Sequence, residues 1–423
     1  MHNFLITTVI LLAFIVILGY FNERVTKFTY EISLMLFSII ISIGLLGLGI
    51  LFKGTEGVTQ VLSHFQFINL ETFLMEGVLC FMLFAGSCHM RLLDFKKHVR
   101  AISLLAFVAT LLGAVFYGLI FYGISALLGL NLSLPVCLMF GSITAPTDPI
   151  AATSILKKFN LPSNIGFIIE GESLLNDGVG VALFVCFSGA VSAQSSGGFF
   201  SVMAKELLGA VLVGIVVTAI TFPMFRKTAE HTRQIFTSLF AVSLAYLLCE
   251  TFGFSGAIAS VVCGVLYSAL RNQQEYKGHP LELEQFDTFW EILDNLLNSI
   301  LYVILGLSFI NILQTPHVLI LSILAIIANL IGRSGSLGVT SLLIGKLPDN
   351  YDKLNFIKLL TWGGLRGGLS VALAMSTQSM VDANTYHIIL GGTYAIVFFT
   401  TIVQGMSMQK VYHSIEKSIA VRN

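Results

Sequence analysis

Apolar residues gather into stretches that recur along the whole chain and are separated by short polar breaks. A helical stretch of about 20 apolar residues crosses a hydrocarbon core about 30 Å thick. The pattern therefore predicts an all-α polytopic membrane protein with about thirteen transmembrane helices. The candidate spans are residues 4–21, 33–52, 70–89, 101–128, 134–156, 163–194, 203–225, 236–252, 254–270, 292–312, 317–345, 355–377 and 386–409.

The basic residues support this number of spans, because they occupy alternate connections. Connections rich in Lys and Arg lie on the cytoplasmic side of a membrane. The basic side chains are Arg24, Lys27, Arg91, Lys96, Lys97, Arg100, Lys157, Lys158, Arg226, Lys227, Arg233, Arg271, Lys277, Lys346, Lys353, Lys410, Lys417 and Arg422. We therefore expect a cell (inner) membrane protein with its N-terminus outside and its C-terminus in the cytoplasm.

Composition excludes several classes of protein. The chain is 56% hydrophobic and 11% charged, whereas a soluble domain has about 25% charged residues. A net charge of zero without a basic run argues against nucleic acid as a partner. The six cysteines are single and lie in apolar stretches, so we interpret them as buried small hydrophobes. No hydrolase or phosphate-binding motif is visible, so neither an enzyme nor a cofactor is expected. The first span is interpreted as a retained helix rather than a signal peptide.

The fifth span contains the sequence TAPTDP, in which Pro146 and Pro149 bracket Thr147 and Asp148. Each proline removes a backbone donor and disfavours helix in the residue before it. The segment is therefore expected to be unwound within the membrane, which is tolerated only where the backbone is buried or lines a cavity. The alternative is a simple proline kink, but a kink does not require an aspartate between the prolines.

The sixth span contains ESLLND, in which Ser173, Asn176 and Asp177 fall on one helical face. Their hydroxyl, amide and carboxylate oxygens suit a hard monovalent cation. The alternative is a polar face that mediates helix packing, although a charge inside a span is costly and is a functional hypothesis by default. Glu172 points away from Asp177, and we expect it to pair with Arg333 of the eleventh span as a structural ion pair.

The twelfth span contains GGLRGG, whose four glycines weaken the helix around Arg366. A second broken helix is expected there, with Arg366 as either a counter-charge or a partner of a helix end. Two broken helices at corresponding positions indicate an inverted-repeat transporter. We expect one transmembrane domain over 1–423, with repeats at about 4–194 and 236–409 and a linker helix at 203–225.

The segments TAPTDP (144–149), ESLLND (172–177) and GGLRGG (363–368) resemble sodium/proton antiporters of the NhaP and sodium/hydrogen exchanger type. The resemblance implies a homodimer with interleaved dimerisation and core subdomains, crossed fifth and twelfth helices, and elevator-like alternating access. It implies Asp177 and Asn176 as the ion- and proton-binding pair, with oxygens from Ser173, Thr147 and Asp148. Glu172 and Arg333 resemble the family's buried ion pair. Glu76 matches an acidic position that either lines the ion path or flanks the site.

The expected function is secondary antiport of protons against sodium, lithium or potassium, with Asp177 as the shared site. Asn176 stands where a second aspartate would add a second charge, so the exchange is expected to be electroneutral. The first alternative is a sodium-coupled organic solute symporter of similar architecture. The second is a channel or a membrane sensor, and the absence of a large soluble domain argues against the sensor.

Overall fold

The computed structural model describes residues 2–51, 77–89, 92–148, 163–191, 199–228, 230–276, 283–307, 318–345, 347 and 351–420. Almost all of these residues are helical, and no strand occurs among them. The helices are α1 (His2–Phe21), α2 (Tyr30–Leu51), α5 (Leu79–Cys88), α6 (Leu92–Ser103), α7 (Thr110–Leu127), α8 (Leu134–Thr144), α10 (Ser163–Val191), α11 (Phe199–Lys227), α12 (His231–Phe252), α13 (Gly256–Tyr276), α14 (Glu284–Leu307), α15 (Val318–Ile344), α16 (Lys353–Trp362), α17 (Gly368–Ser376), α18 (Ala383–Phe398) and α19 (Gly405–Ala420).

The predicted all-α membrane architecture is confirmed. Within the described ranges, 8 helical segments are long and apolar enough to cross a membrane, and shorter apolar helices accompany them. The number thirteen itself stays a prediction. Apolar side chains also cover outward faces: on α11, Leu208 and Leu212 are 70% and 62% exposed. Such faces are the ones that a bilayer would cover.

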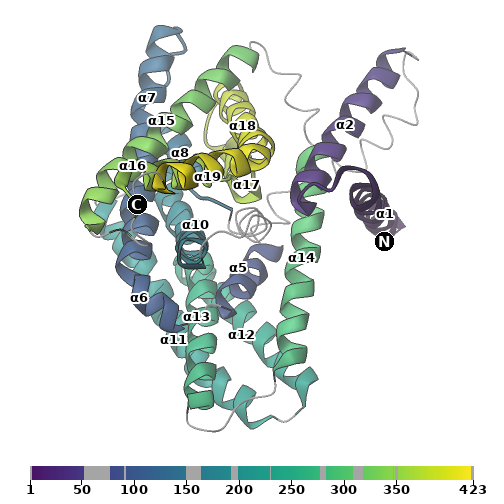
Figure 1. The fold of residues 1–423 in the computed structure, drawn as a ribbon, viewed down its shortest axis with the longest axis vertical. Coiled ribbons are helices and arrows are strands. Elements are labelled where there is room, and N and C mark those ends of the chain that lie inside the picture. The colour runs from purple at the N-terminus through teal and green to yellow at the C-terminus, as the bar shows by residue number, and fades with distance from the viewer. Residues whose placement is uncertain are drawn as a thin grey trace.

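Two groups of neighbouring helices position the site, and both can be followed in Figure 1. Helix α14 stands beside α1 and α2, while α7, α8, α15, α17 and α18 pack together on the other side. The contact between α14 and α2 is close at Gly306, where an added Cβ would lie 2.5 Å from the Ser38 Cβ and 2.7 Å from the Met35 carbonyl oxygen. The Ser42 hydroxyl also donates to the Leu307 carbonyl at 3.1 Å. Helix α14 is therefore anchored on α2.

The predicted interruption of the twelfth span is visible on both sides, and that of the fifth span is visible on its N-terminal side. Helix α8 ends at Thr144, and residues 145–148 are not helical. The continuation of the fifth span from 149 lies outside the described residues. Helix α16 ends at Trp362, residues 364–367 are extended or irregular, and α17 begins at Gly368. The twelfth span is therefore two short helices rather than one.

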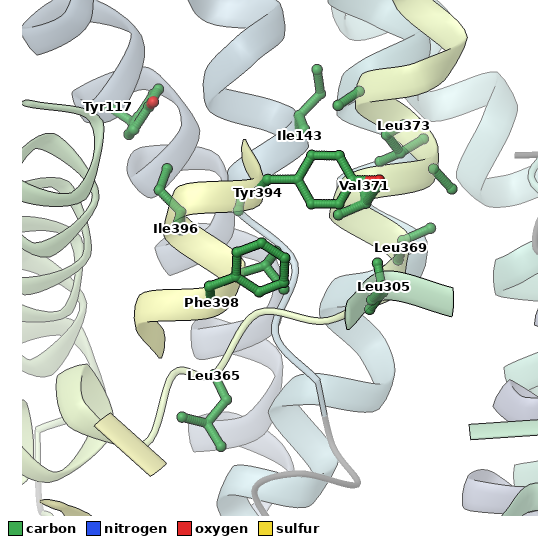
Figure 2. Close-up of a cluster of buried hydrophobic side chains, with 14 of the residues drawn as sticks. Tyr117, Ile143, Leu305, Leu365, Leu369, Val371, Leu373, Tyr394, Ile396 and Phe398 are labelled. Carbon is green, nitrogen blue, oxygen red and sulfur yellow. The ribbon is translucent and has the colours of Figure 1, made fainter. Parts of the chain in front are cut away.

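Apolar packing surrounds the second break. Figure 2 shows Leu365 on the non-helical segment, below Leu369 and Val371 of α17 and Phe398 of α18. Leu365, Val371 and Leu369 are all buried. The non-helical backbone at membrane depth is thus enclosed in protein, which is the condition under which it is tolerated.

Helix boundaries differ from the predicted spans where charged residues extend a helix. Helix α14 begins at Glu284, whereas the predicted span begins at residue 292. Residues 274–289 are predicted to form a polar connector or an interfacial helix. Helix α13 likewise continues to Tyr276, beyond the predicted end at 270. Hydropathy marks where a segment is apolar, but Glu, Gln and Arg are good helix formers and continue the same helix into a polar environment.

Candidate functional site

Three polar side chains from the first break and from α10 form one hydrogen-bonded cluster. The Thr147 hydroxyl lies 2.8 Å from the Ser173 hydroxyl and accepts from the Asn176 amide at 2.7 Å. The Thr147 backbone N–H donates to the Asn176 side-chain oxygen at 3.0 Å. Because α8 has ended at Thr144, this N–H has no intrahelical acceptor, and Asn176 supplies one. The site residues predicted on the fifth and sixth spans therefore lie together in space. All three are buried.

Asp177 and Asp148 lie next to this cluster and face a common cavity. The cavity has a volume of about 350 Å³ and is lined by Asp148, Asp177 and Thr147, together with residues of α5, α14 and α17. Each aspartate is only 8% exposed. The cavity therefore gives two buried carboxylates and one hydroxyl access to a small ion. Oxygen ligands of this kind suit an alkali cation or a proton.

Glu172 and Arg333 form the ion pair that their sequence positions predict. Arg333 Nη2 on α15 lies 2.6 Å from Glu172 Oε1 on α10, and the two side chains are 4% and 1% exposed. Neither residue lines the cavity that contains Asp177. The pair joins α10 and α15 without contributing to the wall of that cavity.

Arg366 binds the backbone of the first break. Its Nη1 donates to the Ala145 carbonyl and, at 2.8 Å, to the Pro146 carbonyl. Its Nη2 donates to the side-chain oxygen of Asn329 on α15 at 3.2 Å. These carbonyls follow the last turn of α8, where the helix dipole is negative. Of the two roles considered for Arg366, this geometry is that of a helix-end partner.

The two breaks cross each other and exchange hydrogen bonds. The Asp148 backbone N–H donates to the Leu365 carbonyl at 2.8 Å. Gly367 packs against the Asp148 carboxyl group, and a Cβ at Gly367 would overlap an oxygen of that carboxylate. The absence of a side chain at Gly367 thus allows the aspartate to lie at the crossing. Gly180 on α10 makes a similar close approach to Pro146.

A π-helical segment, Phe399–Gln404, directly follows α18 and supports the second break. The Arg366 N–H donates to the Thr400 hydroxyl at 3.0 Å, and the Thr401 hydroxyl donates to the Arg366 carbonyl at 3.2 Å. The wider π turn brings two consecutive threonines to one residue of the break, and such turns are frequent at functional sites. The otherwise unpaired backbone of Arg366 is therefore satisfied on both sides.

Two residues of the site have no signal in the sequence. The hydroxyl of Tyr302 on α14 donates to Asp148 Oδ2, and Asn329 accepts from Arg366. Neither residue belongs to a recognisable motif, and only the need of a buried Tyr or Asn for a partner could have indicated it. Glu76, the remaining predicted site residue, lies outside the described residues. The described residues contain no group of three or more His, Cys, Asp or Glu that could hold a metal ion.

Most of the chain is similar in sequence to proteins named as sodium/proton antiporters. The NhaP sodium/proton antiporter of Pseudomonas aeruginosa is 29% identical over 407 residues, which cover 94% of this chain and 93% of that protein. The NhaH sodium/proton antiporter of Halobacillus aidingensis is 30% identical over 73% of this chain and 74% of its own.

A solved structure and a family model complete the comparison. The structure of the sodium proton antiporter MjNhaP1 from Methanocaldococcus jannaschii superimposes with a TM-score of 0.78 over 98% of this chain and 99% of that chain, at 20% identity. That likeness shows the fold. The family model described as "Sodium/hydrogen exchanger, transmembrane" matches residues 61–412. The chain belongs to the sodium/hydrogen exchanger family.

Proposed function

We propose that this protein exchanges sodium for protons across a membrane and that Asp177 carries either ion. The observation that carries the proposal is the juxtaposition of Asp177 with Thr147, Ser173 and Asn176 at the wall of a cavity. A buried carboxylate is stable when it binds a cation or when it is neutralised by a proton. The two ligands therefore compete for one site, which is the requirement for exchange.

The relatives support antiport rather than solute symport. The proteins from Pseudomonas aeruginosa and Halobacillus aidingensis are named as sodium/proton antiporters. The alternative prediction of an organic solute symporter has no support among them. In the proposal, the protein lies in the cell membrane with its C-terminus in the cytoplasm, acts as a homodimer, and moves the crossed breaks between the two sides by alternating access.

The test is the substitution Asp177→Asn, which keeps the shape of the side chain and removes its charge. Sodium-driven proton movement in proteoliposomes, followed with a pH-sensitive dye, should fall to the level of empty vesicles. Melting temperature and elution volume should stay close to those of the parent. Asp382→Asn is the matched control, because Asp382 is an exposed N-cap of α18 and asparagine caps a helix equally well. Robust exchange by Asp177→Asn would overturn the proposal.

A further inference from the structure

We propose that Tyr302 is a positioning residue that holds Asp148 as a carboxylate in the conformation described here, so that Asp177 alone exchanges a proton for sodium in this state. The inference rests on the proposed function and deepens it, because it determines how many protons move with each cation. It starts from one contact: the Tyr302 hydroxyl donates a hydrogen bond to Asp148 Oδ2.

The contact joins the two groups of helices. Tyr302 belongs to α14, which is anchored on α2 through Gly306 and Ser42. Asp148 belongs to the crossing, where its N–H bonds to Leu365 and its carboxyl packs on Gly367. Tyr302 is fully buried, so its hydroxyl is removed from bulk solvent. The Asp148 carboxylate is therefore in contact with both the Tyr302 phenol and the Gly367 backbone.

Two carboxylates line one cavity, and the hydrogen bond from Tyr302 makes their environments different. Like charges in a buried site disfavour each other, and one of them tends to take up a proton. A hydrogen bond donated to the charged form favours that form. Only Asp148 receives one from Tyr302, so the two aspartates have different environments. The proton then goes to Asp177.

The other charged groups around Asp148 do not remove this asymmetry. They are Asp177 and Glu170 on α10, Arg366 at the crossing, Asp294 and Glu291 on α14, His89 at the end of α5, and Glu31 on α2. Arg366 donates its hydrogen bonds to the carbonyls of residues 145 and 146 and to Asn329, while its charge also acts on Asp177. His89 lies 3.5 Å from Asp287. The acidic groups oppose the charge of either aspartate. A neutral donor bonded directly to Asp148 is what distinguishes it from Asp177.

The experiment measures how protons compete with sodium in Tyr302→Phe, which removes the hydroxyl and keeps the ring. In the parent, one exchanging carboxylate should raise the KM for sodium about tenfold for each unit that the pH falls below the titration of the site. In Tyr302→Phe, Asp148 should also take up a proton, and the rise should steepen towards about a hundredfold per unit. A purely structural effect would not change this slope.

Tyr267→Phe is the matched control. The Tyr267 hydroxyl is also buried and donates to the Thr221 hydroxyl at 2.9 Å, on helices that carry neither break. This variant loses a buried hydrogen bond without touching Asp148, and its slope should equal that of the parent. If Tyr267→Phe steepens the slope as much as Tyr302→Phe does, the assignment to Asp148 is wrong.

A binding measurement gives the same information without turnover. Titration calorimetry of sodium into detergent-solubilised protein, in buffers with different ionisation heats, counts the protons released per bound cation. We expect about one proton for the parent and for Tyr267→Phe, and a value approaching two for Tyr302→Phe. Release of one proton by Tyr302→Phe, or an unchanged slope, overturns the role of Tyr302 and leaves the proposed function intact. If the parent itself shows no competition between sodium and protons, the proposed function is wrong.

Discussion

Glu172 and Arg333 are opposite charges that have both been removed from solvent, with their atoms 2.6 Å apart. Deleting one partner leaves the other charge buried without compensation, which typically costs about 3–5 kcal/mol. We therefore predict that Arg333→Ala lowers the melting temperature in detergent sharply. The charge-swapped double variant Glu172→Arg/Arg333→Glu should recover part of the loss. The measurement is thermal unfolding followed by tryptophan fluorescence.

An exposed ion pair in the same chain provides the control for this prediction. Arg233 lies 2.8 Å from Glu230, but the two side chains are 74% and 57% exposed. Exposed pairs contribute about 0–1 kcal/mol, so Arg233→Ala should melt close to the parent. If Arg333→Ala melts no lower than Arg233→Ala, the buried pair contributes nothing to stability.

The residues of the site were predictable where the sequence shows a pattern. Thr147 and Asp148 stand between two prolines, and Ser173 and Asn176 share a helical face, so each carries a local signal. Tyr302 does not, because one tyrosine in the apolar run ILYVILGL is an ordinary core residue. Its hydroxyl acquires a role only when a segment 154 positions away is placed against it. Contacts of that separation are determined by tertiary packing rather than by local sequence.

At the level of the elements, the crossing of the two breaks depends on the space at Gly367. Its φ of −119° and ψ of −162° are ordinary extended values, so alanine would not strain the backbone there. A methyl group would instead displace the Asp148 carboxylate. We predict that Gly367→Ala slows exchange by about 10–100-fold, because displacing a site residue by about 1 Å has effects of that size. Initial rates in proteoliposomes measure this.

Gly338→Ala on α15 is the control, because an added Cβ there meets no atom within 4 Å. It should exchange at the parental rate and should not melt lower, since alanine favours a helix over glycine. Equal rates for the two variants would show that the position of Asp148 is irrelevant to exchange.

The elements themselves were largely predictable, and their ends were not. Long apolar runs gave the helices, and the prolines around 146–149 and the glycines around 366 gave the two interruptions. The support that the π-helical segment Phe399–Gln404 gives to the second break was not predicted. Nothing in the sequence FTTIVQ indicates a π turn, and the contact of its threonines with Arg366 is a tertiary feature.

For the molecule as a whole, the arrangement predicts exchange that membrane voltage does not drive. If Asp177 crosses with one proton in one direction and one sodium ion in the other, the same charge moves in both half-cycles. Voltage acts at about 2.3 kcal/mol per charge per 100 mV, but only on net moved charge. Imposed potassium diffusion potentials of either sign should therefore leave the rate of exchange unchanged in proteoliposomes.

Acceleration by one sign of voltage and slowing by the other would contradict a one-for-one exchange. Glu76 is then the first residue to test, because it is an acidic residue of the predicted third span and would add a second proton. Loss of the voltage effect in Glu76→Gln would identify it as the additional carrier. If the voltage effect persists in Glu76→Gln, Asp148 is the next carboxylate to test as the second proton carrier.

The mutual hydrogen bonding of the two breaks also has a consequence for biosynthesis. Arg366 binds the Pro146 carbonyl from a position 220 residues later in the chain. At a synthesis rate of about 5–20 residues per second, Arg366 leaves the ribosome roughly 10–45 s after the first break does. During that interval the carbonyls that follow α8 lack Arg366, and the N–H of Asp148 lacks Leu365. The first break therefore stays without these hydrogen bonds until the segment around Arg366 has been made, even though most of the helices have already been inserted.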